Sequence, residues 1–367
     1  MEKQLLKKLH TFLTISVCLY IICITQAIAA GTLLRNTIPD SEKTMDCSLV
    51  SPTIQDAINQ APAHATLYLP AGTYNETLTI NKPLHLKGEG ISSTFISTIS
   101  AQNGYAILIS AKEVTISDID LTNQGAGLYT TCIKIIAPNT TIQNCSFHDT
   151  PIGLAIWSSH NTIAGCEFRN CDDEGIVLLG TPTTASSNNT ITSSNFYENC
   201  DGIELQYATN NLITCCMFTH NTHAGIDAII CNNNNNIISH CKFTNNVAFG
   251  LYVARSAYNL ITQCSFSDDL ITFIQASENT LLESQIKHVH LLDDSSLYIE
   301  QCEGFTLSDI LSQQSSFEIQ VNQPENMSQE KKTQTTIHFP FLLTLCSRFA
   351  ILKQFFLSNL YNLFLSP

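Results

Sequence analysis

Two carboxylates, Glu204 and Asp227, follow successive copies of a repeated Gly-Ile pair at the same offset. If each copy belongs to one coil of a stacked structure, the two side chains lie on adjacent rungs of an outer strand face. Such a pair can transfer protons as acid and base on a sugar, or hold a cation such as Ca²⁺. We take Glu204, Asp227 and Asp173 as candidate catalytic residues. The alternative is that they are ordinary solvated residues of an acidic protein.

Aromatic and polar residues accompany this pair. An aromatic ring can cover the apolar face of a sugar ring. Tyr252 continues the same outward row, while Tyr207 and Trp157, the only tryptophan, flank it. The turn that leads into the row is acidic. We therefore predict a substrate-binding set of Trp157, Tyr207, Tyr252, Arg255, Asp172, Glu174 and Asp201.

Short strands of a repeated segment must position these residues. A phenylalanine recurs at intervals of 21 to 28 residues, at Phe147, Phe168, Phe196, Phe218, Phe243 and Phe266. Each segment alternates apolar and polar residues twice, with a turn between, and has no room for a long helix. Such a segment buries its apolar face only by stacking on the next. The pattern predicts an all-β, right-handed parallel β-helix of about eleven coils between residues 66 and 312.

The composition agrees with stacking. Only 13% of residues are charged and the net charge is −14, which disfavours a surface that binds nucleic acid. Stacked like charges would repel along the helix, whereas asparagine amides can donate to one neighbour and accept from the next. One predicted ladder contains Asn161, Asn189, Asn211, Asn236 and Asn259, and a second, at or near one turn, contains Asn170, Asn199, Asn221 and Asn245.

The cysteines follow the same register. Five of the fifteen stand two residues before a repeated phenylalanine: Cys145, Cys166, Cys216, Cys241 and Cys264. Residues that stack inward on parallel strands rarely have disulfide geometry, so we expect a buried column of thiols. Cys171 and Cys200, in turns of adjacent coils, are the best candidates for a disulfide. The column lacks the close pairs typical of metal sites, and we predict no metal site elsewhere.

The ends of the chain differ from its middle. Residues 1–29 resemble a signal peptide, with an uncleaved membrane anchor as the alternative, and either implies export. An extension (30–50) precedes the β-helix (51–313), whose first segment, Thr53 to Ala61, has the pattern of a capping helix. A polar linker (314–337) leads to an apolar helical tail (338–367). Residues 339–365 either fold back on the body or make a peripheral membrane or oligomer contact.

The opening segment of the β-helix and its Asn-x-Ile-x-x-Cys-x-Phe repeats together resemble NosD-like right-handed β-helix proteins, of the pectin-lyase-like superfamily. The resemblance covers about residues 51–302. It implies an extracytoplasmic location and contact with polysaccharide. Relatives include lyases, hydrolases and uronate epimerases, and others without demonstrated chemistry. The motifs of polygalacturonases and alginate epimerases are absent, and four methionines and scattered histidines show no site for copper.

Two functions remain open on the sequence. The first is an exported protein that binds polysaccharide on an outer strand face, with lyase, hydrolase or epimerase activity left undecided. The second is a non-catalytic solenoid of the cell envelope, associated with a membrane through its C-terminal helix. No cofactor is evident, and Ca²⁺ is the one ion that the carboxylate pair suggests.

Overall fold

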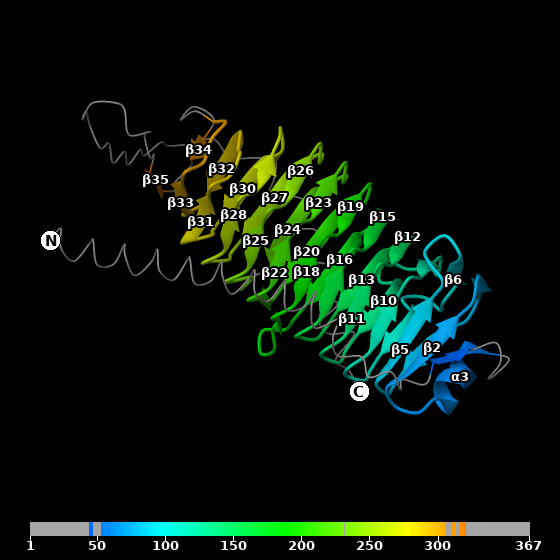
Figure 1. Ribbon diagram of the computed structural model, residues 1–367. Coiled ribbons are helices and arrows are strands. Elements are labelled where there is room, and N and C mark those ends of the chain that lie inside the picture. Colours follow the sequence, from blue (N-terminus) through cyan, green and yellow to red (C-terminus); the bar gives the residue numbers. More distant parts are fainter. Residues whose placement is uncertain (1–43, 47–52, 231, 306–309, 313–315, 321–367) are drawn as a thin grey trace, which may run out of the picture.

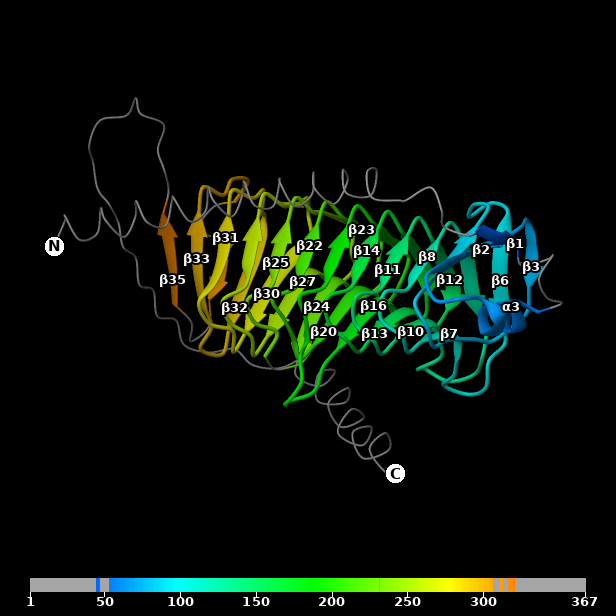
Figure 2. The same cartoon turned by 60° about the horizontal axis from the view of Figure 1, so that its bottom comes forward.

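Nearly all of the described chain is a parallel β-helix. The computed structural model describes residues 44–46, 53–230, 232–305, 310–312 and 316–320. Its strands form three long sheets of thirteen, eleven and nine strands, and one short pair. Successive coils stack side by side along one axis (Figures 1 and 2).

Every described strand pairs in parallel with its counterpart in an adjacent coil. The thirteen-stranded sheet contains β1 (Thr44–Asp46), β2 (Ala65–Leu69), β5 (Leu84–Gly88), β8 (Thr115–Ser117), β11 (Thr141–Gln143), β14 (Thr162–Ala164), β18 (Thr190–Thr192), β22 (Leu212–Thr214), β25 (Ile237–Ser239), β28 (Leu260–Thr262), β31 (Asn279–Leu282), β33 (Ser296–Glu300) and β35 (Ser316–Gln320). The nine-stranded sheet contains β3 (Gly72–Tyr74), β6 (Thr94–Thr98), β9 (Asp120–Asn123), β12 (Ser146–Thr150), β15 (Glu167–Cys171), β19 (Asn195–Tyr197), β23 (Met217–Thr219), β26 (Lys242–Thr244) and β29 (Ser265–Phe266). The eleven-stranded sheet contains β4 (Leu78–Ile80), β7 (Tyr105–Ile109), β10 (Thr131–Ile135), β13 (Ile152–Ile156), β16 (Glu174–Leu179), β20 (Asp201–Gln206), β24 (Ala224–Ile230), β27 (Phe249–Ala254), β30 (Leu270–Ile274), β32 (His288–Leu292) and β34 (Ile310–Ser312). The short pair is β17 (Ser186–Ser187) and β21 (Ala208–Thr209).

These strands confirm the predicted fold class and revise its length. The nine coils from β2 to β30 each contribute a strand to all three long sheets. The next two coils supply strands to two sheets only, within the described residues. The complete coils therefore number about nine, not eleven. Strand β1 lies before the predicted β-helix and β35 lies within the predicted linker, so pairing extends beyond both predicted limits.

A short helix, α3 (Ile54–Gln60), precedes β2 where the sequence predicts one. The Thr53 side chain caps it by accepting a hydrogen bond from the Asp56 N–H at 3.1 Å. The helix lies at the N-terminal end of the solenoid (Figure 2). Its buried side chains join the common core. That it seals this end stays a prediction. The predicted signal peptide and apolar tail lie outside the described residues, and no helix within the described part is long and apolar enough to span a bilayer.

Stacked aromatic rings form the centre of the core. The six repeated phenylalanines are buried and stack face to face, with ring centroids 4.3–4.9 Å apart. Beside them runs the predicted column of cysteines, whose thiols donate to backbone carbonyls two residues earlier at 3.3–3.5 Å. These thiols are not disulfide-bonded, as expected. Cys171 is also a buried thiol, so the disulfide proposed between Cys171 and Cys200 is wrong.

Two asparagine ladders run along the solenoid. In the first, the backbone N–H and the side-chain amide of each asparagine donate to the next side-chain oxygen at 2.9–3.2 Å, through Asn161, Asn189, Asn211, Asn236, Asn259 and Asn279. The second ladder links Asn199, Asn221 and Asn246 and ends on Asp269. Asn170 and Asn245, predicted for it, are instead exposed and have left-handed φ values of 56° and 58°.

Candidate functional site

Close packing at the repeated glycines fixes the register of the candidate site. A Cβ on Gly202 would lie 2.5 Å from the carbonyl oxygen of Gly225 and 2.7 Å from a ring carbon of Phe218. Only glycine therefore lets adjacent coils approach so closely against the aromatic stack. Residues at fixed offsets from these glycines then stack from coil to coil. On the outer face of the eleven-stranded sheet they form one row: Ala155, Val177, Glu204, Asp227 and Tyr252.

The row confirms that Glu204 and Asp227 lie on adjacent strands, as predicted. The predicted exposure of the two side chains is wrong. The sequence predicts both side chains on an open face, whereas each has 0% exposed surface. Neighbouring polar groups account for the burial: the Gln206 amide donates to the Glu204 carboxylate, and the His223 ring lies against Asp227. The two carboxylates are therefore not ordinary solvated residues. A bulge follows them, because the register of β24 shifts between Glu204 and Gln206.

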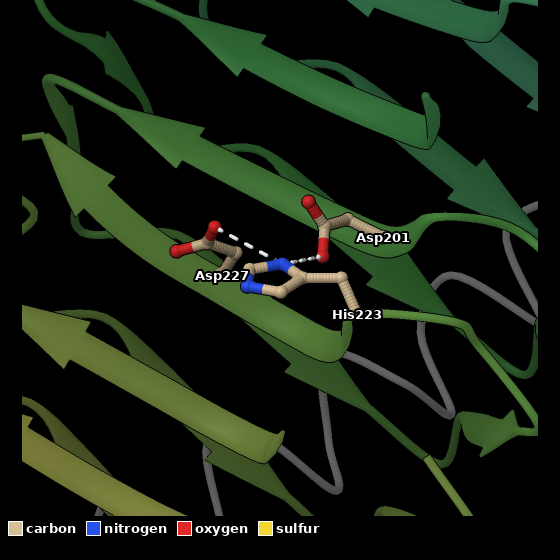
Figure 3. Close-up of side chains that lie close together, drawn as sticks. All are labelled: Asp201, His223 and Asp227. Atoms are coloured by element: carbon tan, nitrogen blue, oxygen red, sulfur yellow. Dashed lines mark hydrogen bonds and ion pairs between the residues drawn. The ribbon is translucent and has the colours of Figure 1, made fainter. Parts of the chain in front are cut away.

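Three side chains meet at this point: Asp201, His223 and Asp227, which we call the Asp-His-Asp cluster (Figure 3). Nδ1 of His223 lies 2.7 Å from Oδ1 of Asp201 and 3.7 Å from Oδ2 of Asp227. The Ala224 N–H also donates to Oδ1 of Asp201 at 2.9 Å. Both carboxylates are fully buried, while the His223 side chain is 37% exposed. The imidazole is therefore the member of the cluster that a ligand from solvent meets first.

Four other predicted binding residues lie on strands of the same sheet or directly after them, at different depths. Tyr252 is half-buried beside Asp227, with its ring centroid 4.9 Å from that of Phe249. Tyr207 and Arg255 are half-buried and adopt positive φ just after β20 and β27. Trp157 follows β13 and is 38% exposed, with the Lys134 ammonium 4.8 Å from its ring centroid. Such a cation–π contact holds the lysine and the ring together at the surface.

The three residues of the predicted acidic turn, Asp172 to Glu174, differ in exposure, and the last of them belongs to the sheet. Asp172 is exposed and Asp173 is half-buried. Glu174 begins β16, is buried, and pairs in register with Asp201 of the next coil. Glu174 thus lies next to the cluster, whereas Asp172 lies in the turn outside the sheet.

The Asp-His-Asp cluster offers one nitrogen and two oxygen donors, which lie within 4.8 Å of one another. This set suits divalent ions, including Zn²⁺, Mn²⁺ and Cu²⁺, and lacks the thiolate or thioether that Cu⁺ prefers. The sequence pattern predicted no metal site, so this donor set was missed. His220, three residues before His223, is not one of these donors: it is exposed, and its ring contacts the Asn245 amide.

His223 is the member of the cluster that the sequence analysis did not group with Asp201 and Asp227. It stands two residues before Gly225, whereas the predicted row was read only from residues after each glycine. Asp201 stands one residue before Gly202 and was assigned to the turn. Because the strand face includes positions on both sides of the glycine, reading the offsets −2, −1 and +2 together would have grouped His223 with Asp201 and Asp227.

A second titratable group lies on the nine-stranded sheet, away from this face. His148 contacts Asp120 through Nε2 at 2.8 Å and Asp149 through Nδ1 at 2.7 Å. The hydrogen bond to Asp120 raises the pKa of His148, which outweighs the opposing effect of burial. The hydrogen bond to His148 lowers the pKa of Asp149.

This contact predicts a pH-dependent contribution to stability. A raised histidine pKa stabilises the folded state fully below the unfolded value of about 6.5, and the contribution disappears as pH rises through the folded pKa. We expect the difference in unfolding free energy between wild type and His148→Gln to shrink from pH 6 to pH 9. Chemical denaturation at each pH measures that difference, and NMR titration measures the pKa of His148. A His148 that titrates at or below its ordinary value would refute the prediction.

Comparison with known proteins identifies the family. Residues 88–283 match the family described as "Periplasmic copper-binding protein (NosD)", which covers more than half of the chain. No curated protein matches the chain. The fold resembles the A-module of the Azotobacter vinelandii mannuronan C-5 epimerase AlgE4, with a TM-score of 0.58 and 14% identity over 73% of this chain and 90% of that one.

Two α-1,3-glucanase structures share the same architecture. The catalytic unit of the Streptomyces thermodiastaticus GH87 enzyme has a TM-score of 0.58 and 12% identity, over 77% of this chain and 68% of that one. A GH87 catalytic domain in complex with nigerose has a TM-score of 0.51 and 15% identity, over 77% and 69%. Identities this low establish a shared fold and nothing about activity. The family match and the stacked parallel coils together show that this chain belongs to the NosD family of right-handed β-helix proteins.

Proposed function

We propose that this protein binds polysaccharide on the outer face of its eleven-stranded sheet and processes it by proton transfer. The observation that carries the proposal is the stacking of Glu204, Asp227 and Tyr252 on three adjacent strands. Carboxylates beside an aromatic ring are the groups with which proteins hold and cleave sugars. Supporting it, the printed names of the structural relatives describe an alginate-type epimerase and α-1,3-glucanases.

Each side chain then has a role. Glu204 and Asp227 are the proton-transfer pair, and Tyr252 covers a sugar ring beside them. Trp157, with Lys134 against its ring, provides a second platform two strands away. Hydrolysis, elimination by a lyase and epimerisation all need such a proton transfer. The proposed reaction is one of these three. The periplasmic family supports an exported protein that meets glycans outside the cytoplasm.

A non-catalytic solenoid is the second candidate. The observation in its favour is the complete burial of Glu204 and Asp227, together with large apolar side chains exposed at turns, such as Leu128 and Val247. Exposed apolar groups of this kind can contact other proteins or an envelope surface. In that case the carboxylates would stabilise stacking and take no part in chemistry.

A binding panel separates the two candidates. The wild type would be titrated with neutral and acidic polysaccharides, with and without calcium, alongside Tyr252→Ala and Trp157→Ala. We expect wild-type binding to at least one polymer, and at least about fivefold weaker binding by Tyr252→Ala, because loss of a stacking ring removes about 1 kcal/mol or more. Tyr258→Ala, at an exposed tyrosine outside the row, is the matched control. Absence of binding to every polymer would favour the solenoid.

A further inference from the structure

We propose that the outer face of the eleven-stranded sheet selects neutral polysaccharides and excludes polymers that carry a carboxylate on each sugar, such as polyuronates. This inference rests on the proposed function, because it names the class of substrate for the same face. The face contains an acidic segment on β16, β20 and β24 and an apolar segment on β13 and β16. Each segment disfavours a ligand carboxylate, for a different physical reason.

The acidic segment consists of four buried residues, Glu174, Asp201, Glu204 and Asp227, on three adjacent strands. These three strands contain no lysine or arginine. Salt screens buried charges much less than exposed ones, so the segment repels an anion that approaches from solvent. Like charges that face each other across an interface suppress binding of the wrong partner. A neutral sugar ring meets no such repulsion.

The apolar segment consists of Ile152, Ala155 and Val177, which form a cluster separate from the interior core. Tyr129 and Leu179 pack against this cluster and are half-buried. A carboxylate that came to lie on such a surface would lose its water without gaining a hydrogen-bond partner, which is unfavourable. The apolar face of a neutral sugar ring is instead stabilised by contact with aromatic and aliphatic side chains.

Positive charges lie beside these two segments and not between them. Lys134 is the only lysine in strands β10 to β27 of this sheet, and it pairs in register with Ala155 at the edge of the apolar segment. Arg255 directly follows β27, one strand beyond the acidic segment. The His223 imidazole contacts Asp201 and Asp227 themselves (Figure 3). A polyuronate along the face could therefore pair a carboxylate with a cation at each end, while the carboxylates between would meet the two segments.

Pairs of polymers with the same backbone and different charge test this inference. Dextran, hydroxyethyl cellulose and mannan would each be titrated into the full-length protein by calorimetry, beside a carboxymethyl derivative of the same backbone. EDTA in the buffer prevents calcium from bridging carboxylates. Where the neutral polymer binds, we expect at least about tenfold weaker binding of its derivative. One repulsion between unit charges about 8 Å apart, at an effective dielectric constant of about 20, corresponds to about thirtyfold in affinity.

Salt and one pair of variants show whether the difference is electrostatic and where it arises. Raising NaCl from about 0.05 M to about 0.5 M should increase the affinity of wild type for the carboxymethyl derivative, because salt screens repulsion. Glu204→Gln should also increase that affinity and leave binding of the neutral polymer unchanged. Glu198→Gln is the matched control, because it removes an exposed charge from the turn before β20, outside the row. It should leave both affinities unchanged.

The outcomes separate this inference from the proposed function. Equal or tighter binding of the carboxymethyl derivatives, or an affinity for them that falls with salt, would overturn the selectivity and leave polysaccharide binding intact. The same gain in affinity from Glu198→Gln as from Glu204→Gln would assign the repulsion to the net charge of the protein and overturn the role of this face. Binding of neither member of any pair would contradict the proposed function, and this inference with it.

Discussion

Replacing Phe218 by alanine should lower the free energy of unfolding by about 3–5 kcal/mol, the cost of removing a buried aromatic ring and leaving a cavity. Phe218 is fully buried in the middle of the stack, with its ring centroid 4.9 Å from that of Phe196 and 4.8 Å from that of Phe243. Each coil contacts only its two neighbours, so the cavity weakens two interfaces at once. Urea denaturation followed by circular dichroism measures the change.

The adjacent residue provides the control. Met217 precedes Phe218 in β23, but its side chain is 49% exposed on the outside of the coil. Met217→Ala should change the free energy of unfolding by no more than about 0.5 kcal/mol. If Phe218→Ala were as mild as Met217→Ala, the phenylalanine stack would not be the main source of contact between coils.

Replacing Glu204 by glutamine should lower polysaccharide turnover at least about 100-fold, the usual contribution of one proton-transfer group. Glutamine has the shape of glutamate and can still accept the hydrogen bond from Gln206, so stacking on Asp227 is preserved. Binding of the polymer should therefore be retained. Product formation is measured on the polymer that binds most tightly in the panel.

A second glutamate on the same coil controls for loss of charge. Glu198 is exposed in the turn before β20 and lies outside the row. Glu198→Gln should keep full turnover. Undiminished turnover by Glu204→Gln, or no product from wild type on any polymer that it binds, would contradict a catalytic role for Glu204.

The repeat made the fold predictable from sequence. Residues such as Phe218 and Asn211 stack on residues of the same type in adjacent coils. The spacing of these residues along the sequence therefore gives the length of one coil. The same register correctly paired Glu204 with Asp227 and placed the cysteines in one column. Low charge and abundant asparagine follow from the same stacking requirement.

Features that depend on packing outside the repeat were not predictable. Alternation indicates which side of a strand a residue faces, but not whether other groups cover it, and so Glu204 was expected in solvent. His223 was not grouped with Asp201 and Asp227 because it lies in a turn, where alternation no longer applies. The number of complete coils was overestimated because β31 and β33 keep the apolar pattern of the thirteen-stranded sheet although their coils lack a strand in the nine-stranded sheet, within the described residues.

Fluorescence of Trp157 tests most directly whether the outer face of the eleven-stranded sheet binds polysaccharide. The chain contains one tryptophan, so its emission reports on this face alone. Trp157 is partly exposed at the end of β13, two strands from Glu204. Titration with a polymer that the panel shows to bind should shift the emission, and the shift should saturate with the dissociation constant found in the panel. If the polymer binds with the affinity found in the panel but leaves the emission of Trp157 unchanged, the binding site lies elsewhere and the account is contradicted.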